Sequence, residues 1–126
     1  MYLADTNIFL ELLLSQEKHK VCKEFLYKNL AHLNISDFSL HSIGVILFKK
    51  RRETTFLKFA DDFVSKVGIL TLSKANYPGL AGTGRKLSLD FDDSYQFAVA
   101  KEHGLKIVSM DRDFEKVKGE IEVIFL

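Results

Sequence analysis

The sequence is poor in cysteine, proline and tryptophan. Its 126 residues include one cysteine, Cys22, one proline, Pro78, and no tryptophan. A lone cysteine cannot form an internal disulfide, and Cys22 falls in the apolar stripe of a predicted helix, so we expect a buried, unreactive thiol. An apolar share of 47% with eleven phenylalanines excludes disorder by composition. These features predict one domain over residues 1–126 with a single packed interior.

The chain also lacks a dominant charge and a long hydrophobic run. The formal net charge is +1, so overall basicity does not indicate nucleic-acid binding, and any such role must rest on local patches. No apolar run approaches the roughly 20 residues that cross a bilayer. The amino terminus has no basic segment, and Asp5 interrupts its apolar stretch. We therefore expect no membrane association and a cytoplasmic location.

Short apolar runs alternate with stretches of helical periodicity. Strands are expected near residues 2–5, 33–36, 69–72, 107–109 and 121–125, and helices over 7–14, 16–30, 37–52, 53–66 and 92–103. Asp37 or Ser39 is expected to cap the third helix, and Gly104 to end the last one. The glycine-rich stretch 79–86 is expected to form a flexible edge of the site. The alternation predicts an α/β fold of three layers, α/β/α, with a central parallel sheet of four to five strands.

Acidic residues follow apolar runs at distant places in the chain. Asp5 and Asp111 each end such a run, and Asp93 stands at the start of a predicted helix. Ligands gather beyond the carboxyl ends of parallel strands, where these side chains can meet. Carboxylates at close range repel one another unless a proton or cation lies among them, and hard divalent cations take oxygen ligands. The pattern predicts a divalent-metal site, although each acid alone could instead cap a helix or form a turn.

Three segments together resemble a known family. Asp5-Thr6-Asn7, the stretch from Asp93 to Ala100, and the stretch from Ser109 to Phe114 resemble the PIN-domain ribonucleases, most closely the small VapC toxins of VapBC toxin–antitoxin pairs. The resemblance spans nearly the whole chain. It implies an endoribonuclease, a hydrolase that cleaves RNA with water activated by Mg²⁺ or Mn²⁺. It also implies restraint by a cognate VapB-like antitoxin, and a homodimer is common among such domains.

The resemblance assigns roles to individual positions. Catalysis and metal binding fall to Asp5, Asp93 and Asp111. Asn7 and Ser109 match polar neighbours of the metal site. Asp92 and Asp113 lie beside matching positions, where either could hold a metal-bound water.

One position departs from the family pattern Ser-x-x-Thr-x-x-Glu. In the stretch 36–42, Ser42 stands where the glutamate is expected, and a hydroxyl contributes no negative charge. Two interpretations stay open: an active nuclease, with Asp92 or Asp37 as substitute carboxylate, or a PIN-fold module that binds RNA or protein with weakened or lost catalysis. A phosphoryl-accepting receiver domain would also gather acids at strand ends. It requires a lysine after a late strand, and residues 109–113 offer none.

Basic residues are candidates for contacts with RNA phosphates. They are Lys49, Lys50, Arg51, Arg52, Arg85 and Arg112. The first four follow one another at a predicted helix end, where cations also complement the helix dipole and stay solvated. Arg112 is the strongest candidate because it is next to Asp111.

Overall fold

The computed structural model describes residues 1–126 and contains one sheet of five parallel strands. The strands are β1 (Tyr2–Ala4), β2 (Leu33–Ser36), β3 (Gly68–Leu70), β4 (Lys106–Ser109) and β5 (Val123–Phe125). Their order is β3-β2-β1-β4-β5, so the first strand of the chain lies at the centre of the sheet. The predicted parallel sheet is confirmed.

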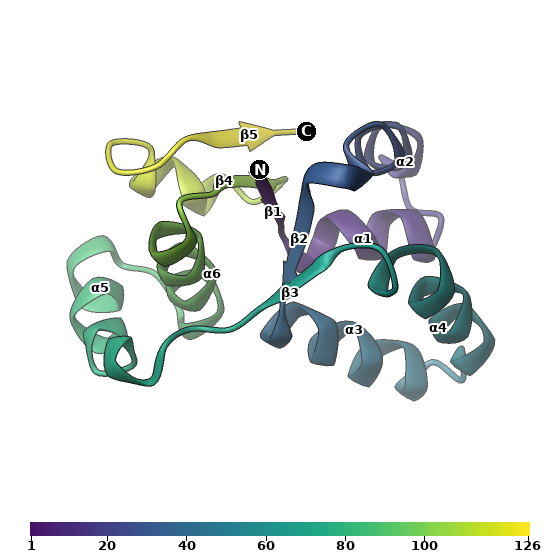
Figure 1. Cartoon of the computed structure of the whole chain (residues 1–126), viewed down its shortest axis with the longest axis horizontal. Coiled ribbons are helices and arrows are strands. Elements are labelled where there is room, and N and C mark those ends of the chain that lie inside the picture. Colours follow the sequence, from purple (N-terminus) through teal and green to yellow (C-terminus); the bar gives the residue numbers. More distant parts are fainter.

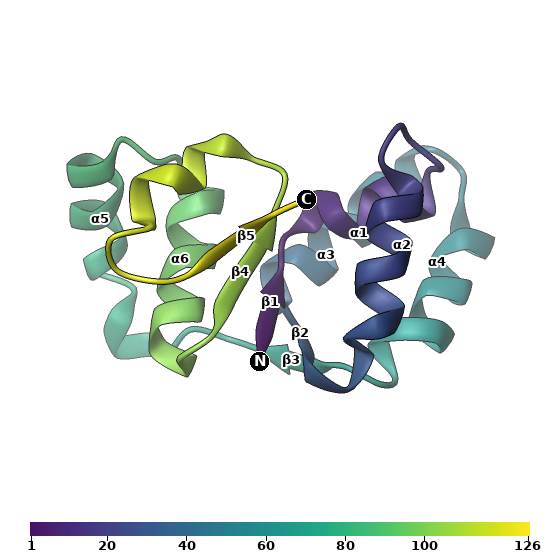
Figure 2. The ribbon, with the colours of Figure 1, turned by 90° about the horizontal axis from the view of Figure 1, so that it is seen from above.

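Helices cover both faces of this sheet, as Figures 1 and 2 show. They are α1 (Thr6–Leu13), α2 (His19–Lys28), α3 (Asp37–Lys49), α4 (Glu53–Phe59), α5 (Gly79–Leu87) and α6 (Phe91–His103). A π-helical turn, Ala60–Val64, continues α4, and short 3-10 turns occupy Leu30–His32, Lys74–Asn76 and η4, Arg112–Val117. The three-layer α/β/α architecture is therefore as predicted. None of these helices has the length and apolar character needed to span a membrane.

The interior consists of two apolar layers, one on each side of the sheet. Neighbouring strand residues point to opposite faces, so Ala4 and Val108 pack with α1 to α4, while Leu3 and Ile107 pack with α5, α6 and η4. All four side chains are buried. Strands that are apolar on both faces explain why the sheet could be predicted from short uninterrupted runs. Cys22 is also fully buried in the first layer, as expected.

Two local predictions were wrong. The cap of α3 is Ser36, whose Oγ accepts a hydrogen bond from the Ser39 backbone N–H at 3.0 Å, rather than Asp37 or Ser39. The stretch 79–86 is not a flexible edge but most of helix α5, which packs on α6. Its helix forms because Leu80 is buried against α6, and it ends at Ser88, which adopts the left-handed conformation with φ of 53°.

Candidate metal centre

The candidate site lies where the two central strands end. Asp5 directly follows β1, and Asp111 follows β4 by two residues. The strands are neighbours, with Ala4 paired to Val108, and the Asp5 backbone N–H donates to the Val108 carbonyl at 2.9 Å. Parallel pairing therefore brings both acids to the same edge of the sheet, although more than a hundred residues separate them in sequence.

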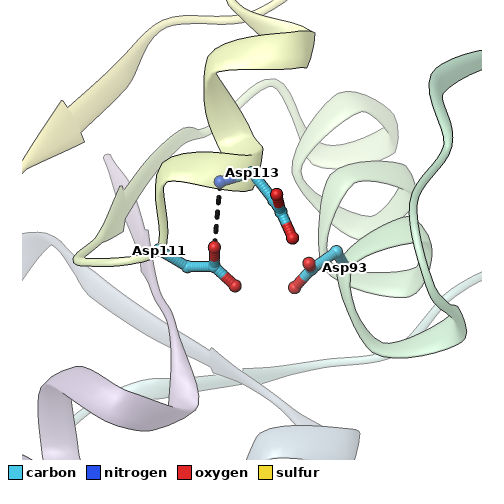
Figure 3. Close-up of side chains that lie close together, drawn as sticks. All are labelled: Asp93, Asp111 and Asp113. Atoms are coloured by element: carbon cyan, nitrogen blue, oxygen red, sulfur yellow. Dashed lines mark hydrogen bonds between the residues drawn. The ribbon is translucent and has the colours of Figure 1, made fainter.

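Three carboxylates form a close group at this edge. Asp93, Asp111 and Asp113 each offer an oxygen, and these oxygens lie within 4.8 Å of one another. Figure 3 shows the three side chains pointing toward a common space from α6 and from the start of η4. Asp93 is buried, Asp111 is half-buried and Asp113 is exposed, so the group is open to solvent on one side. The structure thus joins Asp93 and Asp111 and adds Asp113, which the sequence had placed in a supporting position.

Asp93 lies in the first turn of α6 but does not cap this helix. Asp90 is the N-cap, and its Oδ1 accepts a hydrogen bond from the Asp93 backbone N–H at 3.0 Å. Helix capping was the alternative explanation for the acids at the start of this helix, and Asp90 is the one that caps it. The Asp93 side chain is 7% exposed and is directed to the acidic group instead.

A buried serine links the ends of the two strands. Ser109 Oγ donates to Asp5 Oδ2 at 2.8 Å and accepts from the Asp111 backbone N–H at 2.9 Å. The Oδ1 atom of Asp111 in turn accepts from the Asp113 backbone N–H at 2.9 Å, which makes Asp111 the cap of η4 (Figure 3). Ser109 therefore fixes Asp5 relative to the segment that carries the other two acids.

Asp5 lies beside the close group rather than within it. Its carboxylate is 7% exposed and accepts hydrogen bonds from the Thr6 backbone N–H at 2.8 Å, from Ser109, and from Gln96 Nε2 at 3.3 Å. It caps α1 through the Thr6 bond, so the capping interpretation of Asp5 also holds. Its charge still acts on the group, because Asp5 is one of the charges that raise the pKa of Asp93.

Burial and mutual repulsion disfavour full ionisation of these acids. Burial raises the pKa of Asp93 to about 7, and the charges of Asp111, Asp90, Asp5 and Asp113 contribute in the same direction. Burial also raises the pKa of Asp5, against the effect of its hydrogen bonds from Ser109, Gln96 and Thr6. Near neutral pH the Asp93 carboxyl is therefore harder to ionise than an ordinary aspartate. A divalent cation would remove the need for a proton there, since it neutralises the same charges.

The donor set fits a hard divalent cation. All three grouped ligands are carboxylates, and neither histidine nor cysteine belongs to the group. Mg²⁺ and similar ions prefer oxygen ligands and bind proteins through a few carboxylates while keeping several waters. Asp113 is exposed, so water can reach the group from that side.

Several predicted supporting residues lie outside the close group. Asn7 is exposed in the first turn of α1, and Asp92 is exposed on α6. Ser42 is half-buried on α3 and lines a cavity of about 430 Å³ together with Asp37. The Asp37 carboxylate is engaged there, because its Oδ1 accepts a hydrogen bond from the Tyr95 hydroxyl at 2.6 Å.

The candidate RNA-contacting cations are spread over the surface. The run from Lys49 to Arg52 is exposed at the end of α3, and Arg85 is exposed on α5. Arg112 is directed toward the carboxyl-terminal strand: its Nη1 donates to Glu115 at 3.0 Å, and its guanidinium lies 4.3 Å from the Phe125 ring centroid.

The sequence analysis assigned no role in the site to three residues of this region. Lys116 places its Nζ 3.7 Å from Asp113 Oδ1 and donates to the Ser88 carbonyl at 3.0 Å. Gln96 and Ser39 are buried behind Asp5 and are hydrogen-bonded to each other. For Gln96 a signal existed: it follows Asp93 by three residues, and residues at this spacing share one face of a helix.

Comparison with known proteins places the chain in a family. The PIN domain model matches residues 2–120, and the chain therefore belongs to the PIN-domain family. No curated protein sequence matches it significantly.

Several solved structures with the same fold come from toxin–antitoxin systems. A toxin–antitoxin complex from Klebsiella pneumoniae is 22% identical with a TM-score of 0.78, covering 98% of this chain and 96% of the other. VapC20 of Mycobacterium tuberculosis, a toxin that cleaves the sarcin-ricin loop, is 16% identical with a TM-score of 0.77, covering 91% and 93%. VapBC2 of Rickettsia felis, bound to a fragment of its promoter DNA, is 20% identical with a TM-score of 0.74, covering 99% and 98%. At these identities the likeness establishes the fold.

Proposed function

We propose that this chain, a single PIN domain over residues 1–126, is a Mg²⁺- or Mn²⁺-dependent endoribonuclease and the toxin of a VapBC-like toxin–antitoxin pair. The observation that carries the proposal is the group of Asp93, Asp111 and Asp113 at the end of the central strands. Family membership and the toxins of the same fold support it. The substrate class, RNA, comes from the family resemblance and from the VapC20 neighbour.

The residues of the site have distinct proposed roles. Asp93, Asp111 and Asp113 would hold the ion, and Asp5 would add its charge from behind. A bound divalent ion supplies Lewis acidity, which lowers the pKa of water and offsets negative charge on the scissile phosphate. Ser109 keeps Asp5 and the backbone of Asp111 in fixed relation. No side-chain nucleophile is required, because water is the attacking group.

The second candidate function is a PIN-fold module that binds RNA or protein without turnover. Ser42 favours it, since this position lacks the carboxylate of the family pattern. Incubation of the purified protein with structured RNAs and Mn²⁺ distinguishes the two. Cleavage that stops in chelator and in Asp93→Asn, but persists in the exposed control Asp61→Asn, supports the nuclease. Intact RNA together with measurable Mn²⁺ binding supports the module.

We further propose a cognate antitoxin and a homodimer as partners. Large apolar side chains stand more than half exposed on α3, where Val45 is 54% and Phe48 is 55% exposed, and Phe91 at the start of α6 is 55% exposed. Val45 and Phe48 line one shared hollow on α3, and a contiguous exposed apolar patch commonly marks a protein contact. Light scattering of the purified protein, alone and with the product of an adjacent small open reading frame, tests both partners. A monomer that binds no such product contradicts both.

A further inference from the structure

Gln96 is a buried polar residue that the proposed chemistry does not use directly. Its side chain is 2% exposed on α6, and its Nε2 donates to Asp5 Oδ1 at 3.3 Å and to Ser39 Oγ at 2.7 Å. Ser39, on α3, is fully buried and accepts a second hydrogen bond from Thr6 Oγ1 at 2.8 Å. Thr6 N–H donates in turn to Asp5 Oδ1. Asp5, Thr6, Ser39 and Gln96 thus form a closed ring that joins α1, α3 and α6.

The buried amide of Gln96 would be unfavourable if this side chain only filled space. Gln96 Oε1 is buried and has no hydrogen-bond partner. An unsatisfied buried acceptor carries a desolvation cost that an apolar side chain of similar size would avoid. The hydrogen bonds that can offset this cost are those of Nε2, and the charged group among their acceptors is the Asp5 carboxylate.

Gln96 and Ser109 hold Asp5 from opposite sides. Gln96 and the Thr6 N–H bind Oδ1, while Ser109 binds Oδ2. Ser109 also accepts from the Asp111 N–H, so the hydrogen bonds run without a break from Ser39 to the backbone of the acidic group. A neutral donor suits this place, because another carboxylate would add repulsion, and an apolar group would leave Oδ1 held by the Thr6 N–H alone.

We propose that Gln96, supported by Ser39, is a positioning residue that holds the Asp5 carboxylate against the metal-binding acids. The inference rests on the proposed function, since it concerns the same metal centre. Outer hydrogen-bond partners that orient metal ligands typically change metal affinity by about 10- to 100-fold when removed. Gln96 lies one hydrogen bond further out, because Asp5 acts on the ligands by its charge and through Ser109, so we expect a loss at the lower end of this range.

The test measures the dissociation constant for Mn²⁺ by calorimetry, with thermal unfolding of the same samples. Gln96→Met keeps the length of the side chain and removes the donor, and we expect it to remain folded and to bind Mn²⁺ about tenfold more weakly. Ser39→Ala should weaken binding in the same direction, and the double variant should show less than the sum of both effects. Ser94→Ala is the matched control: Ser94 Oγ is buried in the same helix and has no partner, so its removal should leave Mn²⁺ affinity unchanged.

The outcomes separate this inference from the proposed function. Wild-type affinity in folded Gln96→Met, with Mn²⁺ bound normally by the wild type, overturns the positioning role and leaves the metal centre intact. Absence of Mn²⁺ binding by the wild type overturns both. If Gln96→Met does not fold, Ser39→Ala decides: unchanged affinity overturns the inference, and weaker binding supports it. An equal loss in Ser94→Ala also overturns it, because the effect would then reflect the packing of α6.

Discussion

Replacing Asp93 by asparagine should stabilise the metal-free protein at neutral and higher pH. The folded protein raises the pKa of Asp93 from 3.8 to about 7, because the side chain is buried and surrounded by Asp111, Asp90, Asp5 and Asp113. The folded state therefore keeps a proton that the unfolded state releases. The stability contributed by the protonated carboxyl is fully present below about pH 3.8 and is lost as the pH rises to about 7. Asparagine has no proton to lose, so the variant escapes this loss.

The size of the effect follows from the two pKa values. A shift from 3.8 to about 7 is about 3 pKa units, which corresponds to at most about 4 kcal/mol at about 1.4 kcal/mol per unit. Solvent reaches the group through Asp113, whose side chain is 57% exposed, and screening reduces the repulsion. We therefore expect Asp93→Asn to gain about 2 kcal/mol above pH 7. For a chain of this size that is a rise in Tm of roughly 8 °C.

The assay is urea denaturation in chelator at several pH values, with wild type, Asp93→Asn and the control Asp61→Asn. The difference in unfolding free energy between Asp93→Asn and wild type should be small near pH 4 and reach its maximum by pH 8. Saturating Mn²⁺ should reverse the order, because about 100-fold excess over the dissociation constant adds about 2.7 kcal/mol to a protein that binds it. A difference independent of pH, or an Asp93→Asn variant less stable than wild type at pH 8 in chelator, would refute the reasoning.

Three further predictions concern neighbouring groups. Asp113→Asn should weaken Mn²⁺ binding by more than the roughly tenfold typical of an outer hydrogen-bond partner, whereas exposed Asp92→Asn should change it less; equal effects in calorimetry would exclude Asp113 as a ligand. Lys116→Met should strengthen Mn²⁺ binding, because its Nζ lies 3.7 Å from a group carboxylate. Lys118 is paired with Glu115 instead, so the control Lys118→Met should leave Mn²⁺ binding unchanged. An unchanged dissociation constant for Mn²⁺ in both variants contradicts the prediction for Lys116. Cys22, whose thiol pKa is raised by burial, should react with Ellman's reagent only after denaturation.

The sheet could be predicted because its strands are apolar on both faces. Leu3 with Ala4, and Ile107 with Val108, face opposite layers, so each strand appears in the sequence as an uninterrupted apolar run. Helix α5 could not be predicted in the same way, because its glycines and the preceding proline resemble a loop. Contacts with α6 stabilise that helix, and Leu80 makes them only once the chain has folded.

The candidate site likewise has one part that the sequence could predict and one part that it could not. Asp5 and Asp111 follow strands, so parallel pairing alone predicts that they approach one another. The entry of Asp113 into the close group depends on the tight 3-10 turn of η4, which Asp111 caps through the Asp113 N–H. The role of Gln96 depends on α6 meeting α1 and α3. The spacing from Asp93 places Gln96 on the same face of α6, but local periodicity predicts neither the turn of η4 nor the contacts of Gln96 with Asp5 and Ser39.

The serine at position 42 weighs less against a metal centre than the family pattern alone implies. Burial, together with the charges of Asp111, Asp90, Asp5 and Asp113, already raises the pKa of Asp93 to about 7. A further carboxylate beside the group would raise that pKa again and increase the competition of protons with a cation at neutral pH. Ser42 instead lines a separate cavity with Asp37. Attraction for a divalent ion therefore does not require a glutamate on α3. What the serine removes is a possible ligand, and Asp113, at the open side of the group, offers another.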